Sequence, residues 1–259
     1  MSYYLGVDIG SVATKVVLIK KESNILFLGG KISSTGSNGN LVAQKLIDEL
    51  IRENNLNIND IKKILATGYG RINVSFTDLT KTEISCHAKG AKFIFPKTKT
   101  IIDIGGQDSK AIKLGNNGNV LDFVMNDKCA AGTGRFLEVM SHALQVNLSD
   151  FGKFHLESEK EIEISNICTV FAESEVISLI SEGVDKKDVI KGINYSVAKR
   201  ALTLLKRVNI DEEVTMTGGV AKNKGVVFAL EDLLKLKINI PDNPDLIGAL
   251  GASIYASES

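Results

Sequence analysis

Several residue types and patterns are scarce in this sequence, and each scarcity excludes a class of protein. There are only three cysteines, an odd number at wide spacing, which argues against a disulfide framework and favours a reducing compartment. Basic and acidic residues number 31 each, with no block of like charge, so a surface for nucleic acid or anionic membranes is not favoured. No apolar run approaches the roughly 18–20 residues of a membrane span. Only three prolines and no low-complexity stretch give no sign of a flexible linker.

The remaining composition is that of an ordinary globular protein. Hydrophobic residues make up 44% and charged residues 24% of the chain, which allows a sizeable core. The length of 259 residues suffices for two compact lobes or one large domain. The first residues, MSYYLGVDIGS, already read as a buried strand, so we expect no signal peptide. We therefore expect a soluble cytoplasmic protein that binds neither nucleic acid nor membranes.

One supersecondary unit occurs twice. LGVDIGSVATKVVLI at residues 5–19 aligns with TIIDIGGQDSKAIKL at residues 100–114. Each copy reads as strand, tight glycine turn and strand, which predicts a β-hairpin with an acidic residue ending its first arm. The repeat predicts two related lobes, over residues 1–98 and 99–259, that meet in a cleft. The identical pairs are Asp8 and Asp103, Ile9 and Ile104, Gly10 and Gly105, and Lys15 and Lys110.

Strands and helices alternate through the rest of the chain, which predicts an α/β sheet protein. Alternating or continuous apolar runs predict strands over residues 25–33, 61–66, 119–125, 214–217 and 237–240. Apolar residues at helical spacing predict helices over residues 41–52, 82–95, 135–145, 170–181 and 187–208, another after Gly219, and a last one from about Asp245.

The hairpins have the residue types that nucleotide chemistry needs. Glycine at a turn lets backbone N–H groups approach phosphate oxygens, and an aspartate beside it can hold Mg²⁺ or orient a water. Lys15 and Lys110 would offset phosphate charge. A third glycine turn, TMTGGVAKN at residues 215–223, enters a helix after a buried strand, which suits packing against an adenosine.

These three elements resemble the superfamily of actin, sugar kinases and heat-shock ATPases over essentially the whole chain. The resemblance implies two ribonuclease-H-like α/β lobes with ATP in the cleft between them. Two hairpins that conserve a shape and bind nothing are the structural alternative.

Two cysteines stand before predicted helices. Cys129 precedes the turn at residues 132–134, and Cys168 lies in SNICTVFAESEV, where Asn166 or Thr169 could cap the helix. A helix N-terminus favours negative charge, so it stabilises a thiolate or an anionic ligand. Three interpretations are open: buried free thiols, a zinc site that lacks histidines at ligand-like spacing, or half of a four-thiolate iron–sulfur site completed by a two-fold dimer.

Four motifs together look like those of the ATP-dependent activators of (R)-2-hydroxyacyl-CoA dehydratases, of the 2-hydroxyglutaryl-CoA type in the BadF/BadG/BcrA/BcrD ATPase family. They are DIGGQDSK, MNDKCAAGTGRF, CTVFAESEVIS and MTGGVAKN. The resemblance implies a homodimer with one 4Fe–4S cluster ligated by Cys129 and Cys168 of both subunits. It also implies that ATP binding and hydrolysis drive one-electron transfer from ferredoxin or flavodoxin to the dehydratase.

The resemblance assigns roles to the nucleotide-site residues. Asp8 and Asp103 would be the Mg²⁺ and water-organising acids, with Gln107 beside them. Lys222 stands where related sequences often have glutamine, and Asp245 precedes the last helix. The nucleotide-binding residues are Ser11, Val12, Ala13, Thr14, Lys15, Gly105, Gly106, Gln107, Gly218, Gly219, Lys222 and Asp245.

The remaining candidates read as structural. Cys86 and His87 are adjacent in a predicted helix and point about 100° apart, which makes a poor chelate. We expect Cys86 to be buried, and His142 and His155 to be surface or satisfied helix residues. The turn at residues 67–71 could line the cleft or be structural. Rival functions are an activator of a benzoyl-CoA-type or other double-cubane reductase, a small-molecule kinase, and an ATP-binding switch without a cluster.

Overall fold

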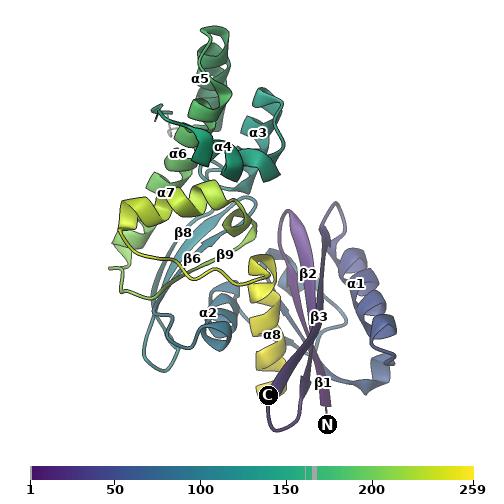
Figure 1. Cartoon of the computed structure of the whole chain (residues 1–259). Helices are drawn as coiled ribbons and strands as arrows, with labels where there is room; N and C mark the ends of the chain where they lie inside the picture. Colours follow the sequence, from purple (N-terminus) through teal and green to yellow (C-terminus); the bar gives the residue numbers. More distant parts are fainter. Residues whose placement is uncertain (1, 161, 165–167) are drawn as a thin grey trace. The chain divides into compact units, whose positions relative to one another are not determined.

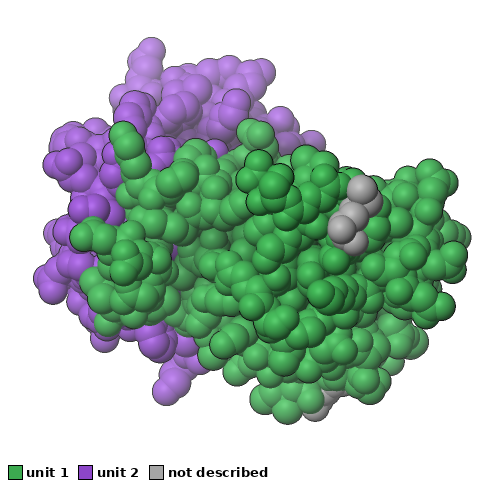
Figure 2. Space-filling view, turned by 90° about the horizontal axis from the view of Figure 1, so that it is seen from below, with its two compact units in different colours: residues 1–98, 114–121, 241–259 green, residues 99–113, 122–240 purple. Residues whose placement is uncertain are grey.

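The computed structural model describes residues 2–160, 162–164 and 168–259 and divides the chain into two compact units (Figures 1 and 2). The first unit comprises residues 1–98, 114–121 and 241–259, and the second comprises residues 99–113 and 122–240. Asn166, one of the two expected caps, lies outside the described residues. No helix in the described ranges is both long and apolar enough to cross a bilayer.

The first unit is built on a mixed sheet with strand order β3-β2-β1-β4-β5. Strands β1 to β3 are antiparallel neighbours, whereas β4 runs parallel to β1 and β5 parallel to β4. Buried aliphatic residues of β1 and β2, such as Leu5 and Val16, form its core together with helix α1. The strands are β1 (Ser2–Ile9), β2 (Ala13–Lys21), β3 (Ile25–Ser34), β4 (Ile61–Thr67) and β5 (Leu79–Thr80).

Three helices belong to this unit: α1 (Gly39–Glu53), α2 (Glu83–Ile94) and α8 (Ile247–Glu258). Helix α8 is rich in small residues and lies against α2 so closely that a Cβ at Gly251 would overlap the carbonyl group of Cys86. This close approach explains why residues 241–259 pack with the first unit, whereas the sequence-based division placed them in the second lobe.

The second unit is built on a sheet with strand order β8-β7-β6-β9. Strands β6 and β7 form the second antiparallel hairpin, and β9 runs parallel to β6. The expected strand over residues 237–240 is reduced to a single bridge between Asn239 and Thr215. The strands are β6 (Thr100–Ile104), β7 (Ser109–Leu114), β8 (Val120–Asn126) and β9 (Val214–Thr217).

Helices α3 to α7 of the second unit pack around a core that contains the buried rings of Phe136 and Phe151. They are α3 (Gly134–Leu144), α4 (Phe151–Glu157), α5 (Thr169–Ser181), α6 (Lys186–Arg207) and α7 (Lys224–Leu234). Short 3-10 turns in the chain are η1 (Ile58–Asp60), η2 (Tyr69–Asn73), η3 (Leu148–Asp150), η4 (Gly219–Lys222) and η5 (Pro244–Leu246).

Candidate functional site

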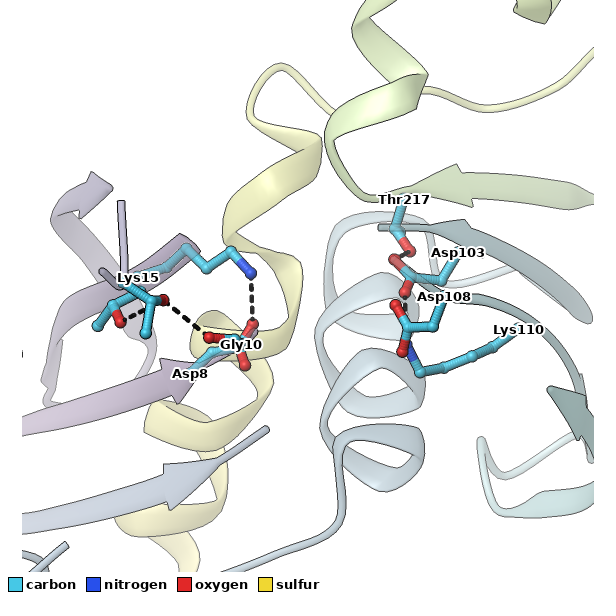
Figure 3. Close-up of polar contacts among 9 residues, drawn as sticks. Asp8, Gly10, Lys15, Asp103, Asp108, Lys110 and Thr217 are labelled. Atoms are coloured by element: carbon cyan, nitrogen blue, oxygen red, sulfur yellow. Dashed lines mark hydrogen bonds and ion pairs between the residues drawn. The ribbon is translucent and has the colours of Figure 1, made fainter. Parts of the chain in front are cut away.

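The first hairpin places Asp8 at the end of β1, directly opposite Lys15 on β2. Lys15 Nζ donates to Asp8 Oδ2 at 3.1 Å, and both side chains are largely buried (Figure 3). The turn between them is closed by Gly10 N, which donates to the Ala13 carbonyl at 3.1 Å. Thr35 Oγ1 donates to the Gly10 carbonyl at 2.7 Å. The phosphate-loop candidates at residues 11–14 thus lie on a turn held from both sides.

The second hairpin repeats this arrangement and adds contacts. Lys110 Nζ donates to Asp103 Oδ2 at 3.2 Å and to Asp108 Oδ2 at 2.7 Å. Thr217 Oγ1 donates to Asp103 Oδ1 at 2.8 Å (Figure 3). Gly105 N closes the turn on the Asp108 carbonyl at 2.9 Å, and Gln107 is exposed at its tip. Both oxygens of Asp103 are therefore engaged by side chains of its own unit.

The third glycine turn follows β9 and touches the second hairpin. Gly218 has φ +83°, and a Cβ there would overlap the Ile104 carbonyl and lie 2.9 Å from Asp103 Oδ1. The turn ends at Asn223, whose Oδ1 accepts from Gly225 N at 2.9 Å and caps α7. Asn223 Nδ2 also donates to Asn194 Oδ1 on α6 at 3.1 Å. The turn is thus fixed at both ends by buried contacts.

The nucleotide-site candidates Lys222 and Asp245 differ in setting. Lys222 is exposed at the end of η4 in the second unit. Asp245 is half-buried in η5, just before α8, in the first unit. The two residues thus belong to different units.

Cys129 lies in a loop whose C-terminal end is hydrogen-bonded to the turn of the second hairpin. Gly134 N donates to the Gly105 carbonyl at 2.9 Å, and Arg135 N donates to the Gly106 carbonyl at 2.8 Å. Thr133 Oγ1 donates to the Gly106 carbonyl at 3.0 Å and to the Ala130 carbonyl at 2.6 Å. The first turn of α3 thus joins the candidate phosphate loop to the segment that carries Cys129.

The two candidate ligand cysteines are not placed alike, although the sequence led us to expect it. Cys168 is the N-cap residue of α5, whereas α3 is capped by Thr133, several residues after Cys129. Both thiols are partly exposed, and Cys129 packs against the core of the second unit. No three His, Cys, Asp or Glu side chains gather into a metal site within the described ranges. One chain therefore offers at most two thiolates of a larger ligand set.

Helix α5 presents an apolar face to solvent directly after Cys168. Val170, Phe171 and Ile177 are 64%, 66% and 51% exposed. The hydroxyls of Ser174 and Ser178 donate to the helix's own carbonyls at 3.2 and 3.0 Å. This α5 face (residues 170, 171, 174, 177 and 178) has no charged side chain, and its two serine hydroxyls donate their hydrogen bonds within the helix.

The remaining candidates are buried side chains. Cys86 is completely buried, as expected, and burial raises the pKa of its thiol to about 12. His155 is also buried, and burial together with the charge of Lys191 lowers its pKa to about 4. His87 lies near Asp8: a Cβ at Gly248 would be 2.9 Å from His87 Nε2 and 3.1 Å from Asp8 Oδ2.

The sequence alone assigns no role to Thr133 or Thr217, and it leaves the turn that begins at Thr67 as either cleft lining or structural. Thr217 and Thr133 each make a contact described above, and Thr67 ends the strand beside Asp8. The available signal was the Thr-Gly pair that ends both β4 and β9, at residues 67–68 and 217–218.

A known protein family covers nearly the whole chain. A model of the BadF/BadG/BcrA/BcrD ATPase family matches residues 5–256. The chain belongs to this family. It is 49% identical to the 2-hydroxyisocaproyl-CoA dehydratase activator of Clostridioides difficile, over 98% of this chain and 94% of the relative. It is 47% identical to the (R)-2-hydroxyglutaryl-CoA dehydratase activating ATPase of Acidaminococcus fermentans, over 98% of this chain and 96% of the relative.

Solved structures of family members have the same fold. The activator of the 2-hydroxyisocaproyl-CoA dehydratase from Clostridium difficile with bound ADPNP superposes with a TM-score of 0.92. It shares 48% identity over 99% of this chain and 94% of that chain. A ROK family glucokinase from Streptomyces griseus, 11% identical over 100% of both chains, has a TM-score of 0.59, which indicates a shared fold alone. The chain therefore has the two-lobed ribonuclease-H-like fold of actin, sugar kinases and heat-shock ATPases.

Proposed function

We propose that this member of the BadF/BadG/BcrA/BcrD ATPase family is a homodimeric activator of a 2-hydroxyacyl-CoA dehydratase. It couples binding and hydrolysis of Mg·ATP to transfer of one electron from ferredoxin or flavodoxin to the dehydratase. The names of the relatives at 47–49% identity support a dehydratase as the client. The observation that carries the proposal is the set of hydrogen bonds between the Gly105–Gly106 loop and residues 133–135, just beyond Cys129.

The nucleotide chemistry rests on the two hairpins. In P-loop-like and actin-like sites alike, backbone N–H groups and lysines hold the phosphates, and acids organise Mg²⁺ and water. Mg²⁺ would neutralise phosphate charge and has carboxylate oxygens available here. Asp8 suits direct coordination better than Asp103, because both oxygens of Asp103 are already bonded to Lys110 and Thr217. Asp103 and Gln107 are then the groups for the attacking water.

The thiols fit half of a 4Fe–4S ligand set. Such a cluster takes four thiolates and, when bound, supplies a one-electron carrier of low potential. Cys129 and Cys168 would hold it from each of two subunits related by a two-fold axis. The partial positive charge at the N-terminus of α5 favours negative charge at position 168.

The α5 face supports the second copy of the chain. An exposed helix face that carries Val170, Phe171 and Ile177 and no charge is costly in water and suits a protein interface. The face begins next to Cys168, so covering it with a second subunit would bring the two copies of this cysteine into one interface. A change in the Gly105–Gly106 loop on nucleotide binding would reach this interface through α3.

The decisive measurement is iron and acid-labile sulfide per dimer in anaerobically prepared protein. About four of each per dimer are expected, because four thiolates bind one 4Fe–4S cluster, and a Cys129→Ser variant should lose them. The variant must still bind ATP with unchanged affinity, since Cys129 does not lie in the phosphate loop. Absence of iron after anaerobic reconstitution, in protein that binds ATP, would overturn the cluster and leave a kinase or an ATP-binding switch.

A further inference from the structure

The end of strand β4 in the first unit repeats the end of strand β9 in the second. Each strand ends in a Thr-Gly pair, at residues 67–68 and 217–218, and each glycine has φ +83°. Each strand runs parallel to the first arm of its hairpin. As a result Thr67 is the register partner of Asp8, and Thr217 is the register partner of Asp103. The two units therefore place a threonine beside each candidate catalytic carboxylate.

In the second unit this pair is complete. Thr217 is fully buried, and its hydroxyl donates to Asp103 Oδ1 at 2.8 Å. The same oxygen faces the turn that follows, because a Cβ at Gly218 would lie 2.9 Å from it. Lys110 takes the other oxygen at 3.2 Å. The carboxylate of Asp103 is thus fixed from both sides.

In the first unit the corresponding pair is open. Lys15 takes Oδ2 of Asp8, as Lys110 does in the second unit. Asp8 Oδ1 faces the following turn in the same way, since a Cβ at Gly68 would overlap it. Thr67 is fully buried, yet its hydroxyl has no hydrogen-bond partner among the residues described. The polar group beside this hydroxyl is the thiol of Cys86.

A buried hydroxyl without a hydrogen-bond partner destabilises the fold by about the free energy of desolvating that group. Such groups are therefore rare in native proteins and call for an explanation. A thiol is only a weak hydrogen-bond partner. Rotation about the Cα–Cβ bond of Thr67 moves its hydroxyl among three staggered positions. In the second unit the equivalent side chain has its hydroxyl on the carboxylate.

We propose that Thr67 is a positioning residue for Asp8, and that its hydroxyl donates to Asp8 Oδ1 when the site holds Mg·ATP. This assignment rests on the proposed ATPase function. With Oδ1 held by Thr67, the orientation of the carboxylate would be fixed. Oδ2 would then be available to Mg²⁺ once the ammonium group of Lys15 pairs with a phosphate instead. In this structure the hydroxyl lies beside the thiol of Cys86.

The test compares Thr67→Val with Thr67→Ser in steady-state hydrolysis of Mg·ATP by the full chain. Valine keeps the shape and removes the hydroxyl, and serine keeps the hydroxyl. We expect Thr67→Val to lower kcat about tenfold with KM within about twofold, and Thr67→Ser to restore most of kcat. The melting temperature of Thr67→Val should change little, because the hydroxyl it removes has only the weak contact with the thiol of Cys86.

Two variants serve as controls. Thr217→Val breaks a formed hydrogen bond and should lower the melting temperature by about 2–4 °C, in contrast to Thr67→Val. Cys86→Ala removes the competing thiol and should leave kcat at or above the wild-type value. An active wild type with an equally active Thr67→Val variant would overturn this assignment alone. A wild type without ATPase activity would overturn the proposed function and this assignment with it.

Discussion

At the scale of single residues, buried ion pairs hold the acids of both hairpins. Lys110 is 2% exposed and Asp103 is 3% exposed, and the buried ammonium group is paired with the carboxylates of both Asp103 and Asp108. The hairpin lysines therefore have a structural role that precedes any ligand.

The buried imidazole of His155 makes folding stability depend on pH. Its ring stacks on Tyr195 and Phe228 at 5.7 and 6.4 Å, and its pKa falls from 6.5 to about 4 through burial and the nearby Lys191, against the opposing charge of Asp232. The unfolded chain takes up this proton below pH 6.5 and the folded chain does not until about pH 4. Stability should therefore fall as pH drops from 6.5 to 4, by up to about 3 kcal/mol from this group.

Urea unfolding of the wild type and a His155→Gln variant, at pH 7 and pH 4.5, checks this dependence. The wild type should lose about 2–3 kcal/mol more than the variant between the two pH values. His142→Gln, at an exposed histidine of α3, is the matched control for the substitution itself. Equal losses in the wild type and His155→Gln would show that another group carries the dependence.

The aspartates, lysines and glycines of the hairpins could be predicted from the sequence, because the repeat that contains them is local and contiguous. The threonines could not be predicted in this way. The contact of Thr217 with Asp103 depends on the parallel register of two strands more than a hundred residues apart. A hydroxyl in a buried strand looks the same in the sequence whether it faces a carboxylate or an aliphatic core.

At the scale of elements, periodicity predicted the long helices and the buried strands, and failed where an element is short. Helix α4 (Phe151–Glu157) is too short for an apolar period to show, and the expected strand at residues 237–240 pairs at one residue only. Cys129 lies before α3, as the sequence predicted, and the turn between them needs glycine at residue 132, where φ is +82° and a Cβ would lie 2.6 Å from Arg200 Cδ. Helix α3 begins directly after this turn, with Thr133 as its N-cap residue.

The first turn of α3 should transmit nucleotide binding to the Cys129 loop. A Thr133→Val variant removes the hydroxyl that bonds the Gly106 and Ala130 carbonyls and should cost about 1–2 kcal/mol of stability. The measurement is the rate of Cys129 alkylation in protein without the iron–sulfur cluster, in the presence and in the absence of Mg·ADPNP. The two rates should differ in the wild type and become more alike in the variant, while nucleotide affinity changes little.

Thr133→Ser keeps the hydroxyl and should behave as the wild type in this alkylation assay. Backbone bonds from Gly134 and Arg135 remain in both variants, so a complete loss of the difference is not required. If Thr133→Val and the wild type respond equally to nucleotide, the side chain of Thr133 has no part in coupling the two loops.

At the scale of the whole molecule, the order of the sequence and the division into units differ. Residues 241–259 return to the first unit, where Gly251 of α8 meets the carbonyl group of Cys86 on α2 and Gly6 of β1 meets the carbonyl group of Ala249. Small residues allow these contacts, but a sequence shows where small residues are and not which backbone they approach. The fold class could thus be predicted, and the membership of the last helix could not.

A charge placed in the α5 face should break the proposed homodimer. In a two-fold dimer a Phe171→Glu substitution places one carboxylate of each subunit in the interface. Burying these charges without partners costs several kcal/mol in total. The dissociation constant of the dimer should therefore rise at least about 100-fold. Phe171 is 66% exposed in the single chain, so the folded subunit should keep its melting temperature and its ATP affinity.

Leu156→Glu, at a residue of α4 that is 65% exposed, is the matched control and should stay dimeric. Sedimentation velocity and iron content measured on the same anaerobic samples check both effects, because a cluster shared by two subunits must be lost with the dimer. A Phe171→Glu protein that remained a dimer with full iron would place the interface elsewhere on the chain.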